Sequence, residues 1–314
     1  MQKKQTEKNK EQIKKEKLQS ALRQNLLRRK KSDDKKIKKM PKIAFQGSFG
    51  AYSHLACNEF YPNHESINYH SFKEVFAAVA NEEVDCGILP LENSYAGRVS
   101  EIHNLLQNSN LFITAEHFLK IEHNLAAIKG AKISDIEKIY SHPQALMQCS
   151  ENIDKNIEQI GYNNTAEAAK FIASKNDKKL GAICSKYAAK INNLEILQEN
   201  IQDSKNDNMT IFMVISKQCA EPDPKKKIIT TLSFTIRNIP GSLYKSLGGF
   251  ATNNINMIKL ESYIPGGISE QAKFFISIEG SPEDKNVALA LSELGFFSKT
   301  TKLIGIYNAD PKRG

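Results

Sequence analysis

The feature that most constrains the fold is an alternation of short apolar runs with amphipathic segments, which starts at Lys42. The apolar runs have the length of buried strands. The segments between them carry apolar residues at helical spacing, some after a capping residue such as Ser71 or Asn164. The predicted strands are 42–46, 86–91, 111–118, 124–128, 139–141 and 181–184. This alternation predicts an α/β fold with a parallel or mixed sheet and crossover connections.

Polar groups gather where these predicted strands end. They occupy residues 47–53, 92–94, 141–142 and 203–210. In the last group, Thr210 stands where a polar loop becomes an apolar strand. Because ligands of α/β sheets bind beyond the carboxyl ends of strands, the sequence predicts a cleft at these positions. A hydroxyl at such a boundary can face the cleft while the strand behind it keeps it rigid.

A second pattern follows a charged linker at 218–227, which contains two prolines. Residues 228–308 have the order β-α-β-β-α-β, with predicted strands at 228–236, 255–263, 272–279 and 300–306. This order is typical of a ferredoxin-like unit. Such units often pair edge to edge, so we expect a homodimer or a homotetramer.

The charge of the chain is concentrated in its first 40 residues. The whole chain of 314 residues has a formal net charge of +9. Residues 1–40 hold 16 Lys/Arg and 5 Asp/Glu, whereas the remainder holds 28 and 30. We expect 1–40 to be a basic, disordered arm, with a short amphipathic helix around Leu18, Leu22 and Leu26 as the alternative. The nearly neutral body predicts neither a nucleic-acid nor a membrane partner.

The cysteine pattern predicts a reducing compartment. The five cysteines, Cys57, Cys86, Cys149, Cys184 and Cys219, are scattered and form no C-x-x-C motif. Such a set is typical of reduced thiols that fill apolar space, so we expect a cytoplasmic protein. The sequence also has no apolar run long enough to span a bilayer and no secretory signal.

The polar groups favour a site for a small anion. Gly47-Ser-Phe-Gly50 lacks the third glycine of the dinucleotide motif and the lysine of a P-loop, but its backbone N–H groups can bind a carboxylate. No G-x-S-x-G motif supports a Ser/His/Asp triad, and no spacing indicates a metal site. What remains is a pocket of neutral hydrogen-bond donors.

These residues resemble the prephenate dehydratase family in its monofunctional form. The resemblance covers 43–306 and rests on several motifs in order. They are Gly47-Ser-Phe-Gly-Ala-Tyr-Ser53, Pro90-Leu-Glu-Asn-Ser94, Gly97-Arg-Val99, Ser141-His-Pro-Gln-Ala145, Gln148-Cys149, Asn164-Thr-Ala166, Ile201-Gln-Asp203 and Asn208-Met-Thr-Ile-Phe212. The resemblance implies a catalytic domain at 41–217 with two α/β lobes, similar in fold to type II periplasmic binding proteins. It also implies conversion of prephenate to phenylpyruvate, water and carbon dioxide without cofactor or metal.

The resemblance also implies roles for individual residues. Thr210 is the essential threonine, and we expect it to donate a hydrogen bond to the departing ring hydroxyl. Asn93, Ser94 and Thr165 are expected to hold carboxylates, and His142 either positions the substrate or donates a second proton. The other expected substrate-binding residues are Gly47, Ser48, Gly50, Tyr52, Ser53, Gln144 and Phe212. Cys149 is expected to serve packing.

Residues 228–308 resemble the ACT regulatory domain of the family, which implies feedback inhibition by phenylalanine. The residues expected to bind phenylalanine are Asn238, Gly241, Leu243, Glu261 and Ser262. The sequence Glu261-Ser-Tyr-Ile-Pro265 departs from the more frequent Glu-Ser-Arg-Pro at this place.

Ile211 is a second departure, because the family usually has arginine after the essential threonine. Neighbouring strand residues face opposite ways, so we expect Ile211 to lie outside the cleft that Thr210 faces. Two alternatives to a prephenate dehydratase stay open: an arogenate dehydratase, and a catalytically silent ligand sensor.

Overall fold

The larger of two sheets joins the first lobe of the protein to its C-terminal unit. The computed structural model describes residues 40–203, 208–237, 239–263 and 272–313, so the predicted arm lies outside the described residues except for Met40. The ten-stranded sheet has the order β13-β14-β12-β15-β5-β11-β3-β1-β2, with β4 added to β3. The second sheet has five strands in the order β10-β6-β9-β7-β8. The predicted mixed α/β fold is confirmed.

The first lobe contains the half of the large sheet formed by β1, β2, β3, β4, β5 and β11. Its elements are β1 (Lys42–Gln46), α2 (Tyr52–Phe60), β2 (Glu65–Tyr69), α3 (Phe72–Ala80), β3 (Cys86–Asn93), β4 (Gly97–Arg98), α4 (Ser100–Asn108), β5 (Phe112–Lys120) and β11 (Met209–Ser216). Strand β1 runs parallel to β2 and β3, whereas β11 lies antiparallel between β3 and β5. One apolar cluster lies on each face of this half-sheet, and the side chains of β11 alternate between the two clusters.

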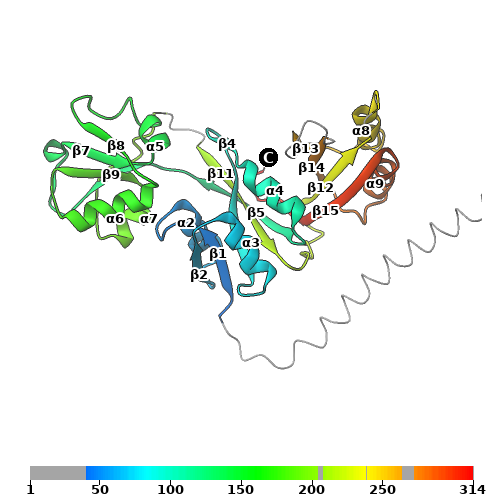
Figure 1. The fold of residues 1–314 in the computed structure, drawn as a ribbon, viewed down its shortest axis with the longest axis horizontal. Helices are drawn as coiled ribbons and strands as arrows, with labels where there is room; N and C mark the ends of the chain where they lie inside the picture. The colour runs from blue at the N-terminus through cyan, green and yellow to red at the C-terminus, as the bar shows by residue number, and fades with distance from the viewer. Residues whose placement is uncertain (1–39, 204–207, 238, 264–271, 314) are drawn as a thin grey trace, which may run out of the picture. The chain divides into compact units, whose positions relative to one another are not determined.

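The second lobe contains the five-stranded sheet and lies beside the first lobe in Figure 1. Its elements are β6 (Asn124–Ala127), a 3-10 turn (Ile133–Asp135), β7 (Lys138–Ser141), α5 (Pro143–Met147), β8 (Glu158–Gly161), α6 (Thr165–Lys175), β9 (Leu180–Cys184), α7 (Lys186–Ile191) and β10 (Glu195–Gln198). Strands β8 and β9 both run parallel to β7.

Two chain segments cross between the lobes and lie side by side. The first runs from β5 to β6, and the second returns from β10 to β11. Ile121 N donates to Asn208 O at 2.7 Å, and Ile201 N donates to His123 O at 2.9 Å. These backbone hydrogen bonds fix the crossing segments to each other next to the start of β11.

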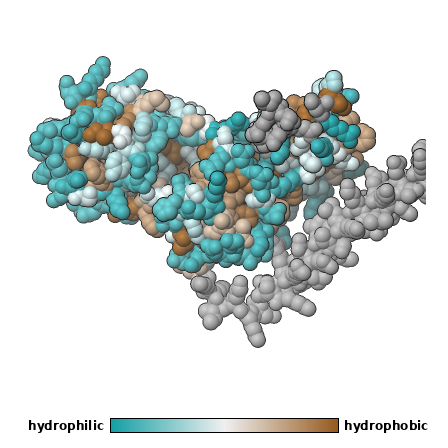
Figure 2. Space-filling view, viewed as in Figure 1, coloured by the Kyte–Doolittle hydropathy of each residue, from teal (hydrophilic) through white to brown (hydrophobic). Residues whose placement is uncertain are grey.

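The C-terminal unit has the predicted β-α-β-β-α-β order. Its elements are β12 (Ile228–Ile236), α8 (Ser242–Thr252), β13 (Met257–Tyr263), β14 (Lys273–Glu279), α9 (Lys285–Phe297) and β15 (Ser298–Asn308). Within the described residues all strand pairs of this unit are antiparallel. Figure 2 shows a largely hydrophilic face with hydrophobic side chains in places, and exposed apolar residues of α8 and α9 include Tyr244, Leu289 and Phe296. In the described part of the chain, no helix combines the length and apolar character needed to cross a membrane.

Gly305 is the residue through which a strand of the C-terminal unit pairs with a strand of the first lobe. It pairs in parallel with Ile113 of β5. A Cβ added at Gly305 would collide with the backbone oxygen of Ile113 and would lie 2.8 Å from its Cβ. The two strands can therefore meet only if this residue has no side chain.

We expect Gly305→Ala to lower the free energy of unfolding by about 1–3 kcal/mol, since backbone must move to admit the methyl group. Gly248→Ala is the matched control, because a Cβ there meets open space and replacing a helical glycine stabilises by roughly 0.5–1 kcal/mol. Urea unfolding of both variants measures the difference. Equal midpoints would show that β15 and β5 are not in close contact.

Candidate active site

The ends of β3 and β11 bring Asn93 and Thr210 together. The two residues are paired across the strands, and Asn93 Nδ2 donates a hydrogen bond of 2.9 Å to Thr210 Oγ1. Asn93 Oδ1 accepts from the backbone N–H groups of Tyr95 at 3.0 Å and Ala96 at 2.9 Å. These two donors identify the oxygen end of the amide. Because Thr210 Oγ1 accepts from Asn93, the hydroxyl keeps its own proton for donation to another group.

Ser94 fixes the boundary between loop and strand that precedes Thr210. Its backbone N–H donates to Met209 O at 3.0 Å, and its Oγ accepts from Met209 N at 3.1 Å. Thr210 itself is buried, with 7% of its surface exposed. These contacts hold the backbone of Met209, which directly precedes Thr210.

A chain of side-chain hydrogen bonds runs from Asn93 into the crossing segments. Asn93 Nδ2 also donates to Asn208 Oδ1 at 2.8 Å, and Asn208 Nδ2 donates to Gln148 Oε1 at 3.0 Å. Gln148 Oε1 lies 3.0 Å from His123 Nε2, and His123 Nδ1 lies 3.1 Å from the hydroxyl of Tyr52. The chain joins residues of both lobes to the Asn93–Thr210 pair.

The direction of this chain follows from its backbone anchor. Since Asn93 Oδ1 is fixed by two N–H groups, each following amide has only one orientation that pairs a donor with an acceptor. Gln148 Oε1 then accepts from His123 Nε2–H at 3.0 Å. The Tyr52 hydroxyl donates its proton to Glu122 O at 2.7 Å, and its oxygen lies 3.1 Å from His123 Nδ1. Burial lowers the pKa of His123, which favours a neutral imidazole.

Stability should fall below neutral pH because three histidines are held neutral. Burial lowers the pKa values of His54, His117 and His123, with Asp310 opposing the shift at His117. Below the ordinary histidine pKa of about 6.5, the unfolded chain binds protons that the folded chain does not. The stabilisation is complete above that pH and is lost as pH falls through the depressed folded values.

We therefore expect the free energy of unfolding to decrease between pH 6.5 and pH 5, by up to about 1.4 kcal/mol per pH unit for each histidine. Urea unfolding at several pH values measures this slope. His117→Gln, which lies outside the hydrogen-bond chain of Asn93, should reduce it. A free energy of unfolding that does not change between pH 6.5 and pH 5 would show that these histidines are not held neutral by burial.

The turn after β1 rests on helices of the second lobe. Ser48 Oγ donates to Glu167 Oε1 at 2.7 Å. Hydrogen bonds from Ser48 and from Asn163 lower the pKa of Glu167. Gly50 has a φ of +94°, and a Cβ there would lie 2.7 Å from Ile191 Cδ1. The two lobes are therefore in direct contact beside this turn.

His142 and Thr165 lie at one edge of the second sheet. Strands β7 and β8 run parallel, with Ser141 opposite Gly161, and His142 and Thr165 follow their carboxyl ends. His142 is the N-cap of α5 and its Nδ1 accepts from Gln144 N at 3.3 Å. Among the described residues, no hydrogen bond joins either residue to Asn93 or Thr210.

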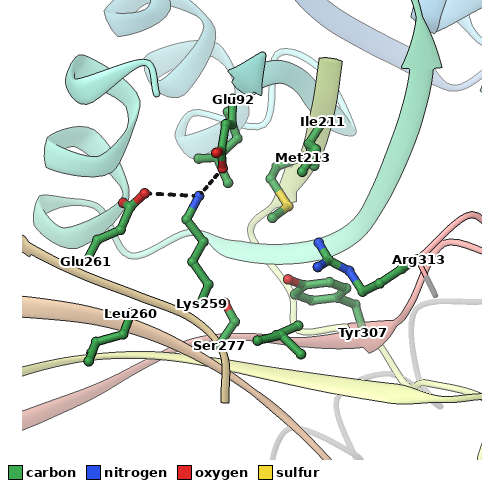
Figure 3. Close-up of a pocket in the computed structure, with 11 residues that line it drawn as sticks. Glu92, Ile211, Met213, Lys259, Leu260, Glu261, Ser277, Tyr307 and Arg313 are labelled. Atoms are coloured by element: carbon green, nitrogen blue, oxygen red, sulfur yellow. Dashed lines mark hydrogen bonds and ion pairs between the residues drawn. The ribbon is translucent and has the colours of Figure 1, made fainter. Parts of the chain in front are cut away.

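Ile211 faces away from Thr210, as strand alternation predicted. Thr210 and Phe212 share one face of β11, and Phe212 packs in the core there. Ile211 belongs to the opposite face and lines a pocket of about 330 Å³ toward the C-terminal unit. Figure 3 shows Ile211 and Met213 side by side at this pocket.

Comparison with known proteins identifies the family of this protein. Residues 43–220 match the family model for prephenate dehydratase. The chain belongs to the prephenate dehydratase family.

Relatives in this family carry more than one activity in their names. The chain is 39% identical over 272 residues to a bifunctional N-acyl-homoserine lactone acylase/prephenate dehydratase of Komagataeibacter europaeus, covering 86% of this chain and 97% of that protein. It is 35% identical over 287 residues to arogenate dehydratase 2 of Petunia hybrida, covering 86% and 72%. The crystal structure of the Arthrobacter aurescens prephenate dehydratase in complex with L-Phe has a TM-score of 0.77 and 27% identity, covering 85% and 89%.

The structure brings some of the predicted site residues together and separates others. Asn93, Ser94 and Thr210 form one group at the end of β3. Other predicted substrate contacts are engaged elsewhere: Ser48 with Glu167, and Tyr52, whose hydroxyl donates to Glu122 O at 2.7 Å. Ser53 and Phe212 are buried, as Thr210 is, and their substrate roles stay predictions. Thr165, His142, Gln144, Gly47 and Gly50 keep their substrate roles as predictions.

The predicted phenylalanine residues also fall in different surroundings. Asn238 lies outside the described residues. Gly241, with a φ of +72°, is the N-cap of α8 and precedes Leu243. Ser262 lies in β13, and the Glu261 carboxylate faces the first lobe, where Oε2 lies 2.8 Å from His103 Nε2.

Sequence reasoning missed the parts played by Asn208, Gln148 and His123. Gln148 and Asn208 lie inside the matched motifs without an assigned role, and His123 lies outside these motifs. The available signal was the position of all three residues at strand or helix ends near the crossing between the lobes. Buried polar side chains at such positions require hydrogen-bond partners.

Proposed function

We propose that the protein is a prephenate dehydratase that forms phenylpyruvate, water and carbon dioxide from prephenate, without cofactor or metal. The observation that carries the proposal is the Asn93–Thr210 pair. It presents a hydroxyl whose oxygen is already occupied as an acceptor and whose proton is available. Membership of the family supports the reaction class.

The reaction needs a donor to the departing hydroxyl more than it needs a base. The bond between the ring and its carboxylate breaks, and the electron pair enters the ring. The bond between the ring and the hydroxyl then breaks, and the hydroxyl leaves as water after taking up a proton. Thr210 supports this departure by hydrogen bonding, while the remaining donors hold the substrate dianion in position.

We further propose that the C-terminal unit is an ACT domain through which phenylalanine inhibits the enzyme. Its β-α-β-β-α-β order supports this proposal, as does the similarity to a solved prephenate dehydratase that contains L-Phe. The exposed apolar side chains of α8 and α9 support the proposal of a homodimer or homotetramer.

Assays with prephenate and with arogenate test the function. The two substrates share the reacting ring and differ in a keto oxygen or an amino group on the side chain. We expect phenylpyruvate from prephenate with the larger kcat/KM. Faster formation of phenylalanine from arogenate would instead identify an arogenate dehydratase. If neither substrate is converted, both hypotheses are rejected.

A further inference from the structure

A row of acidic and basic side chains links the C-terminal unit to the residue next to Asn93. Lys259 Nζ lies 2.7 Å from Glu92 Oε2 and 3.2 Å from Glu261 Oε1. Glu261 Oε2 lies 2.8 Å from His103 Nε2 on α4. Figure 3 shows the Lys259 ammonium between the two carboxylates. The row therefore connects β13 with both β3 and α4.

Three members of this row are poorly exposed, whereas 39% of the Glu92 side chain is exposed. Only 16% of the Lys259 side chain is exposed, as is 16% of Glu261 and 6% of His103. Burial would raise the pKa of Glu261, yet the neighbouring His103 imidazole and the charge of Lys259 lower it to about 2. The contacts of Glu261 with Lys259 and His103 are therefore screened less by solvent than surface ion pairs.

Glu92 connects Lys259 with the Asn93–Thr210 pair because of its position in β3. It directly precedes Asn93 and lies opposite Ile211, on the face of the sheet that lines the pocket. Asn93 therefore faces Thr210 while its neighbour is held by Lys259. A shift of the Glu92 side chain therefore moves the end of β3, which also carries Asn93.

The C-terminal unit also holds α4, the helix that follows this strand end. Lys302 Nζ of β15 donates to Leu106 O at 3.2 Å and to Gln107 O at 2.7 Å, and also to Ser109 O. A cation at the carboxyl end of a helix is favourable. His103 contacts Glu261 one turn earlier, so two side chains of the C-terminal unit contact α4.

We propose that Lys259 is a positioning residue for the reaction: by holding Glu92 it sets the position of Asn93 and Thr210 and couples the C-terminal unit to catalysis. This inference rests on the proposed function and extends it to the way in which the C-terminal unit regulates the reaction. Of the two cations that line the described pocket, Arg313 is engaged by Glu116 at 2.6 Å, which leaves Lys259 for Glu92. A ligand that displaces β13 acts on the active site through this contact.

Lys259→Met in the full-length protein tests the proposal, with Lys299→Met as its control. Lys299 is exposed on β15 and lies in a strand, as Lys259 does. Because a displacement of about 1 Å can cost about 100-fold in rate, we expect kcat for prephenate to fall at least 10-fold with KM changed less than 3-fold. Lys259→Arg should restore most of the rate. Inhibition by phenylalanine should weaken in Lys259→Met.

A second measurement does not depend on turnover. The backbone amides of Tyr95 and Ala96 donate to Asn93 Oδ1, so their hydrogen exchange reports whether Asn93 is held. We expect faster exchange at both amides in Lys259→Met and not in Lys299→Met. If Lys259→Met does not fold, Glu92→Gln takes its place with the same expected effects.

The outcomes separate the two proposals. An inactive wild type with faster exchange in Lys259→Met would reject the proposed function and retain the positional coupling. An active wild type with equal kcat in Lys259→Met and Lys299→Met would overturn the inference, whatever the exchange. Glu92→Gln should add no further loss to Lys259→Met, and fully additive losses would also overturn it.

Discussion

Thr210→Val is expected to abolish turnover of prephenate while leaving the protein folded. Valine has nearly the shape of threonine but lacks the proton that assists departure of the ring hydroxyl. Positioned proton donors contribute about 10²–10⁴-fold, so kcat should fall by that factor. Asn93 Nδ2 keeps Asn208 Oδ1 at 2.8 Å as an acceptor, which preserves the strand end. Steady-state kinetics with prephenate measure the loss.

Two further variants interpret this result. Thr210→Ser retains a hydroxyl and should keep measurable activity. Thr300→Val removes an exposed threonine from β15 and should leave kcat unchanged. If Thr210→Val retains a rate within a factor of three of wild type, Thr210 has no part in the chemistry.

Among the single substitutions described, Arg313→Met is expected to lower the free energy of unfolding most. Glu116 lies in β5 with none of its side chain exposed, and Arg313 pairs with it through Nε at 2.6 Å and through a second nitrogen at 2.7 Å. Removing the cation leaves a buried carboxylate without its partner. Such a loss costs about 3–5 kcal/mol, which chemical unfolding can measure.

The matched control is Arg237→Met, since Arg237 is exposed and has one long hydrogen bond of 3.4 Å to Phe296 O. It should change the free energy of unfolding by about 0.5 kcal/mol or less. Glu116→Leu combined with Arg313→Met should recover much of the stability, because it removes the buried charge as well. A loss in Arg313→Met no larger than that in Arg237→Met would show that Glu116 is not paired in solution.

Sequence periodicity predicted the strands and helices that carry a buried face. The runs around Ile43 and Ile88 became β1 and β3, and alternation placed Thr210 and Ile211 on opposite faces of β11. Short, polar edge strands such as β2 and β8 were missed because few of their residues are buried. Helix α5 ends at Met147, and Gln148 directly after it binds Asn208 of the crossing segments.

Contacts between distant parts of the chain could not be predicted in this way. Glu116 and Arg313 are 197 residues apart, and Glu92 and Lys259 are 167 apart. Charged side chains at such positions look like ordinary surface residues in a sequence, since no local pattern encodes their partner. The resemblance to a family supplied the Asn93–Thr210 pair, but not the hydrogen bonds that orient it.

A single-turnover experiment on the wild-type protein tests the central claim most directly. Enzyme in excess is mixed with prephenate, and bound prephenate, phenylpyruvate and carbon dioxide are followed together. An active site built on Asn93 and Thr210 predicts one phenylpyruvate and one carbon dioxide for each prephenate bound. Prephenate that stays bound and converts no faster than it does spontaneously would contradict the account. The protein would then be a ligand sensor.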